Sequence, residues 1–295
     1  MPDDHANDRH VSFEIRPLSD QFAVEIVGLD LRNPLDAAAH AAVLETLIRF
    51  KAVCFRDQTL SGEQQVAFTQ QFGPLELFTI ANRGIDNPLP LLNIVTNLGK
   101  DGKPTGNLET RRWHTDKSFL SMPCFATILH PVILPSAGGE TCFADMSAAY
   151  DALSAQEKAK LENVRVVHSR EYSIRRAGKV PTPQEIEDAG PPMAHPLVRI
   201  NPYSGRKGLF MGEHASHLEG QEAAGRAPID ALEAYATQEQ FVYRHSWRRG
   251  DVLMWDNGSL LHRGDDNFNV GVQARVLHRT CLSGLAAKAE IAAVS

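Results

Sequence analysis

Three short runs near the end of the chain decide the expected fold: FVYRHSW at 241–247, DVLMW at 251–255 and VQARVLHRTCL at 272–282. Each run is apolar or alternates apolar with polar residues, which is typical of β-strands. Similar runs occur upstream, at 22–31, 52–56, 91–96, 125–134, 141–144, 164–169, 195–200 and 208–212. Many short strands, separated by turn clusters of Asn, Pro and Gly, predict a β-sandwich or a β-barrel.

Helices are expected mainly in the first third of the chain, packed on the outside of the strands. Residues 37–50 carry apolar side chains at helical spacing. Ser61 with Gln64, and Ser154 with Glu157, match the capping box that opens a helix. The predicted class is therefore mostly β with flanking α.

Two long segments, 98–111 and 173–193, are polar and rich in Gly or Pro, and we expect them to be loops. Loops of this length are uncommon and often serve as active-site lids. The 295 residues allow one large domain or two smaller ones, at about 150 residues per domain. No internal repeat appears, and no linker rich in Gly, Ser and Pro divides the chain.

The charge balance argues against nucleic acid as a partner. The chain has 30 Lys and Arg against 36 Asp and Glu, a net charge of −6, so it lacks the broad basic face that phosphate backbones need. It has no apolar run long enough for a membrane span and no apolar secretory signal, so we expect no membrane partner. The four cysteines are scattered without a CxxC pair, which favours reduced thiols in a cytoplasmic protein.

His114 and Asp116, in the stretch WHTD, form the first candidate site. In an extended segment, residues i and i+2 point to the same side, so these two side chains could bind one ion together. His262, which follows a β-run and a tight polar turn, could supply a third ligand. Two histidines and one carboxylate form the facial triad of non-haem Fe(II) oxygenases. Zinc takes the same ligands, so a zinc-dependent hydrolase is the alternative, although the sequence nominates no clear general base.

Two arginines on the last predicted strand form the second candidate site. Arg275, Leu277 and Arg279 share one face by the two-residue period of a strand. Two guanidinium groups inside a barrel would be costly unless each met an anion. Because arginine suits bidentate carboxylate binding, two carboxylate-bearing ligands are implied. The alternative is a pair of surface arginines on an edge strand.

An ordered series of motifs extends along nearly the whole chain. They are GLDL at 28–31, FGPLE at 72–76, WHTDKSF at 113–119, GGETCFADM at 138–146, AYDAL at 149–153, SGRK at 204–207, WDN at 255–257, HRG at 262–264 and ARVLHRT at 274–280. In these motifs the chain resembles the taurine dioxygenase / 2,4-dichlorophenoxyacetate dioxygenase family of Fe(II)- and 2-oxoglutarate-dependent enzymes. The stretches SGRKGLFMGEHASHLEG and ATQEQFVYRHSW most resemble the phenoxyacetate-degrading branch.

This resemblance implies a double-stranded β-helix core, of the jelly-roll or cupin-like type, with outer helices and an active-site lid. It implies a single dioxygenase domain over 12–284, because ligands at 114–116 and 262 must meet. Residues 1–11 would be a disordered tail and 285–295 a C-terminal tail. The relatives also suggest a homo-oligomer.

The resemblance assigns the iron ligands to three residues, His114, Asp116 and His262. It assigns 2-oxoglutarate binding to Thr141, which would hydrogen-bond the cosubstrate, and to Arg275, which would pair with its distal carboxylate. Arg279 would hold the acidic group of the substrate near the metal.

Further candidate substrate contacts lie in two regions. Related phenoxyacetate enzymes carry a lysine in the loop after FGPLE, whereas this sequence reads LFTIANRG. The local replacements are Phe78, Ile80, Asn82 and Arg83. Elsewhere the candidates are Phe119, His214 and His217. The two histidines lie three apart in HASH, so a structural role or a second metal site is an alternative for them.

The implied reaction is hydroxylation of a small anionic substrate, with O2 and 2-oxoglutarate consumed and succinate and CO2 released. For an aryloxyacetate such as 2,4-dichlorophenoxyacetate, attack next to the ether oxygen gives a hemiacetal that collapses to a phenol and glyoxylate. A taurine-like sulfonate and an alkyl sulfate are alternative substrates. A non-catalytic ligand-binding sandwich would leave the metal triad and the paired arginines without a role.

Overall fold

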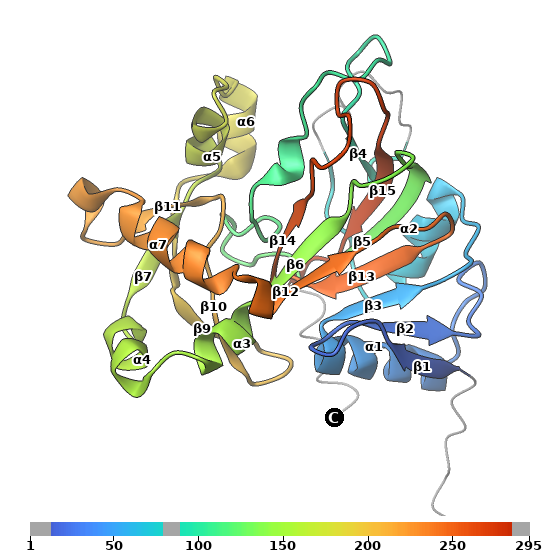
Figure 1. The fold of residues 1–295 in the computed structure, drawn as a ribbon, viewed down its shortest axis with the longest axis horizontal. Coiled ribbons are helices and arrows are strands. Elements are labelled where there is room, and N and C mark those ends of the chain that lie inside the picture. Colours follow the sequence, from blue (N-terminus) through green and yellow to red (C-terminus); the bar gives the residue numbers. More distant parts are fainter. Residues whose placement is uncertain (1–12, 79–88, 285–295) are drawn as a thin grey trace, which may run out of the picture.

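The computed structural model describes residues 13–78 and 89–284, and its largest element is a seven-stranded sheet (Figure 1). The strand order is β1-β2-β3-β13-β5-β15-β4. The bounds are β1 (Glu14–Pro17), β2 (Val24–Val27), β3 (Ala52–Phe55), β4 (Asn93–Thr96), β5 (Ala126–Ile133), β13 (Val252–Asp256) and β15 (Val276–Cys281). The late strands β13 and β15 lie between strands from the first half of the chain, so residues far apart in sequence become neighbours.

A smaller sheet faces the centre of the large one. It contains three strands in the order β12 (Val242–His245), β6 (Thr141–Asp145) and β14 (Leu260–Gly264). Phe143 of β6 packs against Trp255 of β13, with ring centroids 5.2 Å apart. Leu129, Leu253 and Leu277 of the large sheet belong to the same buried cluster. The two sheets form a sandwich, and within the described ranges their hydrogen bonding does not close into a barrel.

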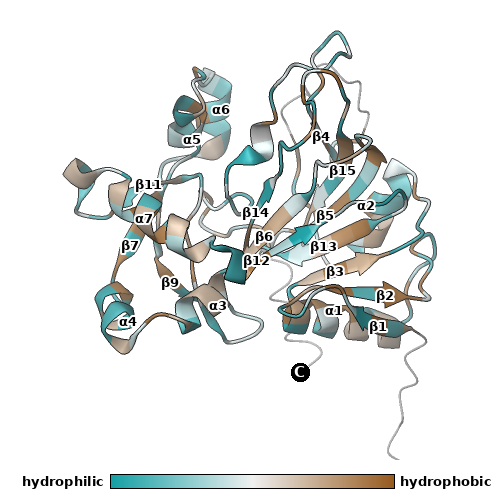
Figure 2. Cartoon of the chain, viewed as in Figure 1, coloured by the Kyte–Doolittle hydropathy of each residue, from teal (hydrophilic) through white to brown (hydrophobic). Residues whose placement is uncertain are grey.

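Two helices cover the outer face of the large sheet, as the sequence predicted. They are α1 (Ala37–Phe50) and α2 (Gly62–Gln70). Val43 of α1 and Phe68 of α2 are buried in one cluster with Met254 of β13. The predicted capping box of Ser61 and Gln64 opens α2. Figure 2 shows hydrophobic residues along β2 and β3, consistent with burial between the helices and the small sheet.

A second layer covers the other side of the small sheet (Figure 1). Its strands are β7 (Arg165–His168), β8 (Met193–Pro196), β9 (Val198–Ile200), β10 (Lys207–Leu209) and β11 (Ala215–Leu218). Its helical elements are α3 (Met146–Asp151), α4 (Ala155–Leu161), α5 (Arg170–Arg176), α6 (Pro183–Ala189), η2 (Glu222–Ala224), α7 (Ala227–Ala236) and η3 (Glu239–Phe241). Met146, Leu209 and Leu261 share its core, so this layer is anchored on β14.

The prediction that 173–193 forms a loop is wrong, because α5 and α6 occupy much of it. A capping box between Thr182 and Glu185 opens α6, and a proline lies in its first turn. Proline is well accepted there, since its missing N–H has no partner in a helix anyway. The other predicted loop, 98–111, is mostly irregular and ends in the short turn η1 (Glu109–Arg111).

The described residues include no helix that is both long and apolar enough to cross a membrane. The four cysteines are free thiols and all are buried.

Candidate active site

A single β-bridge brings the three predicted metal-ligating residues together. The backbone N–H of His114 donates to the carbonyl of His262 at 2.9 Å, and the reverse bond measures 2.8 Å. This bridge extends the small sheet beyond β14 by one strand position. The side chains of His114, Asp116 and His262 are buried, and their nearest ligating atoms all lie within 4.8 Å of one another. Such a group could hold one divalent ion.

Both imidazole rings are in a state suited to metal binding. The Nδ1 of His114 lies 2.8 Å from the carbonyl oxygen of Arg112, which can only accept, so Nδ1 carries the proton. Its Nε2 therefore presents a lone pair. Burial, reinforced by the nearby His114, holds the pKa of His262 well below its ordinary value, so this ring is neutral.

Asp116 supplies the negative charge of the cluster. Its Oδ2 lies 3.7 Å from His262 Nε2 and accepts a 2.6 Å hydrogen bond from the Thr127 hydroxyl, while Oδ1 accepts one from Arg279 at 3.0 Å. Burial alone would raise the pKa of Asp116, but Arg279, the two histidines and the Thr127 hydrogen bond together outweigh burial, and the pKa lies well below its usual range. The carboxylate is therefore ionised, and two imidazoles with one carboxylate fit a divalent metal such as Fe(II).

A pocket adjoins His114 and His262 of this cluster. Its lining is Val95, Thr110, His114, Leu129, Thr141, Trp255, His262, Gly264, Arg275 and Arg279. Both predicted arginines thus face one cavity, as the two-residue period required. The alternative of surface arginines is excluded for Arg275, which is only 1% exposed.

Arg275 carries a buried charge that lacks a carboxylate partner among the described residues. Its Nε donates to the carbonyl of Gly139 at 2.8 Å, and a terminal nitrogen donates to Thr141 Oγ1 at 3.2 Å. Burial lowers its pKa to about 10, so the guanidinium stays charged at neutral pH. A buried charge of this kind needs an anion, which a bound carboxylate would supply.

Arg279 reaches the cavity from β15 and contacts Phe78, one of the predicted substrate residues. Its guanidinium carbon lies 5.3 Å from the centre of the Phe78 ring, and its Nε is buried without a hydrogen-bond partner. The Lys117 Nζ lies 5.4 Å from the centre of the same ring and pairs with Glu76 at 2.7 Å. The other predicted loop residues, Ile80, Asn82 and Arg83, lie outside the described residues.

Phe119 and His214 form a wall close to the metal cluster. Their rings meet edge to face, with centroids 4.9 Å apart, and His214 Nδ1 lies 2.9 Å from Ser173 Oγ. The chain leading to His214 runs directly behind His114: a Cβ added at Gly212 would lie 3.1 Å from the His114 Cα. Burial lowers the pKa of His214 well below its ordinary value, so the ring is neutral.

His217, predicted alongside His214, lies away from the cavity. Its Nδ1 contacts Ser216 Oγ at 2.9 Å and its Nε2 lies 3.8 Å from Glu222. The two histidines are three residues apart, and the two-residue period of a strand places such residues on opposite faces; β11 also has a register shift between Ala215 and His217. The two histidines of HASH therefore do not converge on a second metal.

Two residues around Asp116 were missed at the level of sequence. Thr127 Oγ1 accepts from the side-chain amide of Asn257 at 2.9 Å, so its own proton goes to Asp116. Asn257 Oδ1 in turn accepts from Trp255 Nε1 at 3.1 Å. The WDN motif contains Asn257, but only the fold brings it to Thr127.

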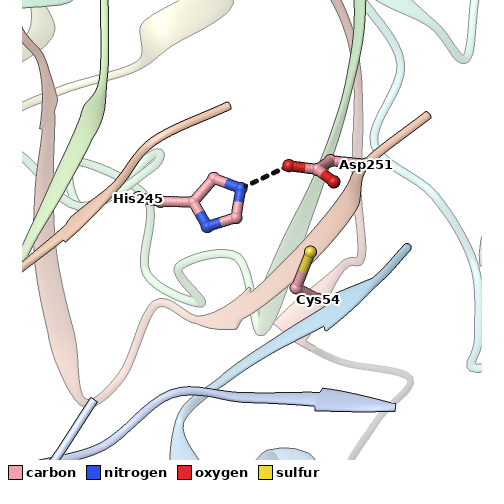
Figure 3. Close-up of side chains that lie close together, drawn as sticks. All are labelled: Cys54, His245 and Asp251. Atoms are coloured by element: carbon pink, nitrogen blue, oxygen red, sulfur yellow. Dashed lines mark hydrogen bonds and ion pairs between the residues drawn. The ribbon is translucent and has the colours of Figure 1, made fainter. Parts of the chain in front are cut away.

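A second buried cluster, Cys54, His245 and Asp251, has metal-like composition (Figure 3). Both ring nitrogens of His245 have partners: Nε2 contacts Asp251 at 3.0 Å and Nδ1 contacts the Tyr243 hydroxyl at 3.0 Å. Both oxygens of Asp251 accept from Arg56 at 2.8 Å. Burial raises the pKa of the Cys54 thiol, so it stays protonated. Because the nitrogens of His245 and the oxygens of Asp251 already have hydrogen-bond partners, these residues form a structural network between β3, β12 and β13 rather than a metal site.

Two histidines and an aspartate, beside a buried arginine without a counter-ion, define a mononuclear metal enzyme that acts with an anionic ligand. A family profile described as "Taurine catabolism dioxygenase TauD, TfdA family" matches residues 14–281. The chain therefore belongs to the TauD/TfdA family, and it is a non-haem iron dioxygenase that depends on 2-oxoglutarate and O2.

Individual relatives agree with this assignment. The chain is similar to an alpha-ketoglutarate-dependent 2,4-dichlorophenoxyacetate dioxygenase of Cupriavidus pinatubonensis, with 39% identity over 266 residues, 86% of this chain and 92% of that protein. It is 30% identical to an alpha-ketoglutarate-dependent sulfate ester dioxygenase of Pseudomonas putida over 289 residues, 93% of this chain and 90% of that protein. The solved structure of AAD-2 with Mn(II) and N-oxalylglycine has a TM-score of 0.81 and 34% identity, covering 92% of this chain and 97% of that one.

Proposed function

We propose that this dioxygenase hydroxylates an aryloxyacetate, such as 2,4-dichlorophenoxyacetate, and releases a phenol and glyoxylate together with succinate and CO2. One domain over 12–284 would carry the activity, with the two facing sheets as a jelly-roll core. The observation that carries the proposal is the buried Arg275, which has no ion-pair partner among the described residues and shares a pocket with His114 and His262.

Each protein group has a distinct task in the proposed reaction. His114, Asp116 and His262 would hold the iron. When bound, Fe(II) with 2-oxoglutarate and O2 supplies an oxidant that removes hydrogen from a nearby C–H bond. With only three protein ligands, the metal would keep further positions for 2-oxoglutarate and O2.

Cosubstrate and substrate would occupy different parts of the cavity. Arg275 would pair with the distal carboxylate of 2-oxoglutarate, and Thr141, which already contacts Arg275, would donate its hydroxyl proton to the same ligand. Leu129 and Trp255 line the cavity with apolar surface that excludes water. Positioning then decides which C–H bond reacts, so the carbon next to the ether oxygen must be held nearest the metal.

The test is succinate formation in the presence of Fe(II), 2-oxoglutarate and ascorbate, measured against a panel of anions. We expect aryloxyacetates to stimulate turnover strongly and His114→Ala to abolish it. Stimulation by a taurine-like sulfonate or an alkyl sulfate alone would replace the proposed substrate. Stoichiometric zinc with turnover in the absence of O2 would favour a hydrolase and overturn the reaction itself.

We also propose that the protein forms a homo-oligomer, is cytoplasmic and has no nucleic-acid partner. The net charge of −6 supports the last point. Light scattering of the purified protein tests the first, and a monomeric mass at micromolar concentration would contradict it.

A further inference from the structure

Helix α5 turns one of its faces toward the wall formed by Phe119 and His214. Residues three and four apart share a helix face, so Arg170 lies on the same face as Ser173 and Ile174. Ser173 contacts His214 directly, and both Ser173 and Ile174 are buried. The chain just before α5 is fixed as well, because the Ser169 N–H donates to the carbonyl of His214 at 2.8 Å. Arg170 is therefore held on the side of α5 that faces the candidate site.

Arg170 differs from the neighbouring arginines in having no partner. In the part of the chain that the structure describes, no carboxylate lies within 4 Å of its guanidinium and no hydrogen bond engages it. By contrast, Arg175 on the same helix pairs with Glu171 at 2.7 Å, and Arg176 lies 3.5 Å from Asp230. Arg170 is also partly buried, so its charge is incompletely hydrated. Such a group gains strongly from an anion that can reach it.

The other cations around the cluster are already engaged. Arg279 donates to Asp116 at 3.0 Å, Lys117 pairs with Glu76 at 2.7 Å, and Arg112 lies 3.5 Å from Glu213. Burial lowers the pKa of Arg170, the charges of Glu213 and Glu185 oppose this, and that of Arg279 adds to it.

We propose that Arg170, on the face of α5 that packs against His214, is a specificity-determining residue that binds the carboxylate or sulfonate of the substrate. The inference rests on the proposed function and names the group that distinguishes acidic substrates from neutral ones. A guanidinium can bind a planar carboxylate through two parallel hydrogen bonds, whereas lysine offers one charged point.

The experiment compares Arg170→Gln and Arg170→Lys with Arg175→Gln, a control on the same helix whose side chain is exposed. KM and kcat are measured with whichever panel anion best stimulates the wild type, and with a neutral amide analogue of that anion. Thermal unfolding of each variant checks the fold.

We expect Arg170→Gln to raise the KM for the anion about 10- to 100-fold, because charge-assisted hydrogen bonds are the strong ones. The KM for 2-oxoglutarate and the constants for the neutral analogue should be unchanged, and Arg170→Lys should be intermediate. If the wild type turns over the anion and the KM of Arg170→Gln stays within about twofold of the wild-type value, the inference about Arg170 is overturned and the proposed function stands. An equal rise for anion and amide would assign Arg170 to packing instead. Failure of every anion to stimulate the wild type would overturn both proposals.

Discussion

Replacing Thr127 with valine tests whether a hydrogen bond outside the cluster sets metal affinity. Valine has nearly the same shape, so the substitution removes the hydroxyl from a site that is 0% exposed without opening a cavity. Asp116 Oδ2 then loses its 2.6 Å hydrogen bond. The carboxylate keeps its bond from Arg279 on Oδ1, so it stays charged but its orientation is less fixed.

The expected loss follows from that one contact. A hydrogen bond to a charged group contributes about 1.5–3 kcal/mol, and about 1.4 kcal/mol corresponds to a tenfold change in a dissociation constant. Because Arg279 still holds the other oxygen, we expect the lower part of this range, a dissociation constant for Mn(II) or Co(II) raised about 10- to 40-fold. Stability should also fall by roughly 1–3 kcal/mol, since the Asn257 amide loses its acceptor.

The assay is calorimetric titration of the metal-free protein with Mn(II) or Co(II), which does not depend on turnover. Thr127→Ser keeps the hydroxyl and should bind metal within about threefold of wild type. If Thr127→Val bound either metal as tightly as the wild type, the hydrogen bond would have no part in fixing Asp116, and this reasoning would be refuted.

Three further predictions concern the cosubstrate, pH and the second cluster. Arg275→Gln should raise the KM for 2-oxoglutarate at least about tenfold and leave metal affinity unchanged; an unchanged KM would remove Arg275 from the cosubstrate site. His168 is buried and its pKa is lowered by burial to about 3. Since the unfolded chain binds this proton near pH 6.5, the free energy of unfolding should fall as pH drops from 6.5 toward 3, by up to about 1.4 kcal/mol per pH unit. Urea unfolding at pH 5 and 7 should show a smaller difference in His168→Gln than in the wild type, and equal differences would contradict this. Asp251→Asn removes a carboxylate that holds both Arg56 and His245, while Glu25 still pairs with Arg56 at 3.1 Å, and should cost about 1–3 kcal/mol, with metal affinity retained; metal loss at unchanged stability would instead favour a metal role for that cluster.

Local rules explain which parts of the fold the sequence predicted well. The capping box of Ser61 and the spacing within 37–50 are short-range signals, and both helices form with nearly those bounds. The placement of Arg275 and Arg279 toward one cavity needs only the two-residue period of a strand. The proximity of His114 to His262 needed more, because it depends on the pairing of distant segments, and the family resemblance supplied that information.

Long-range contacts and local irregularities account for what was missed. Thr127 appears in an apolar run, and nothing near it in sequence indicates a bond to Asp116. His217 lies beside Glu222 instead of the cavity, a separation from His214 that the two-residue period of a strand already implies for residues three apart. The prediction of a loop over 173–193 relied on its Gly- and Pro-rich composition. The capping box of Thr182 and Glu185, a local signal in the same stretch, indicates the helix that the structure shows.

The bridge between His114 and His262 also links metal binding to the stability of the segment around His114. Only two backbone hydrogen bonds tie the segment at 114 to β14, so an ion bound to both residues would act as a cross-link across that junction. Each tenfold excess of metal over its dissociation constant then adds about 1.4 kcal/mol to the closed form. Chelation should therefore expose the segment around 114 to hydrogen exchange and proteolysis well before the large sheet opens.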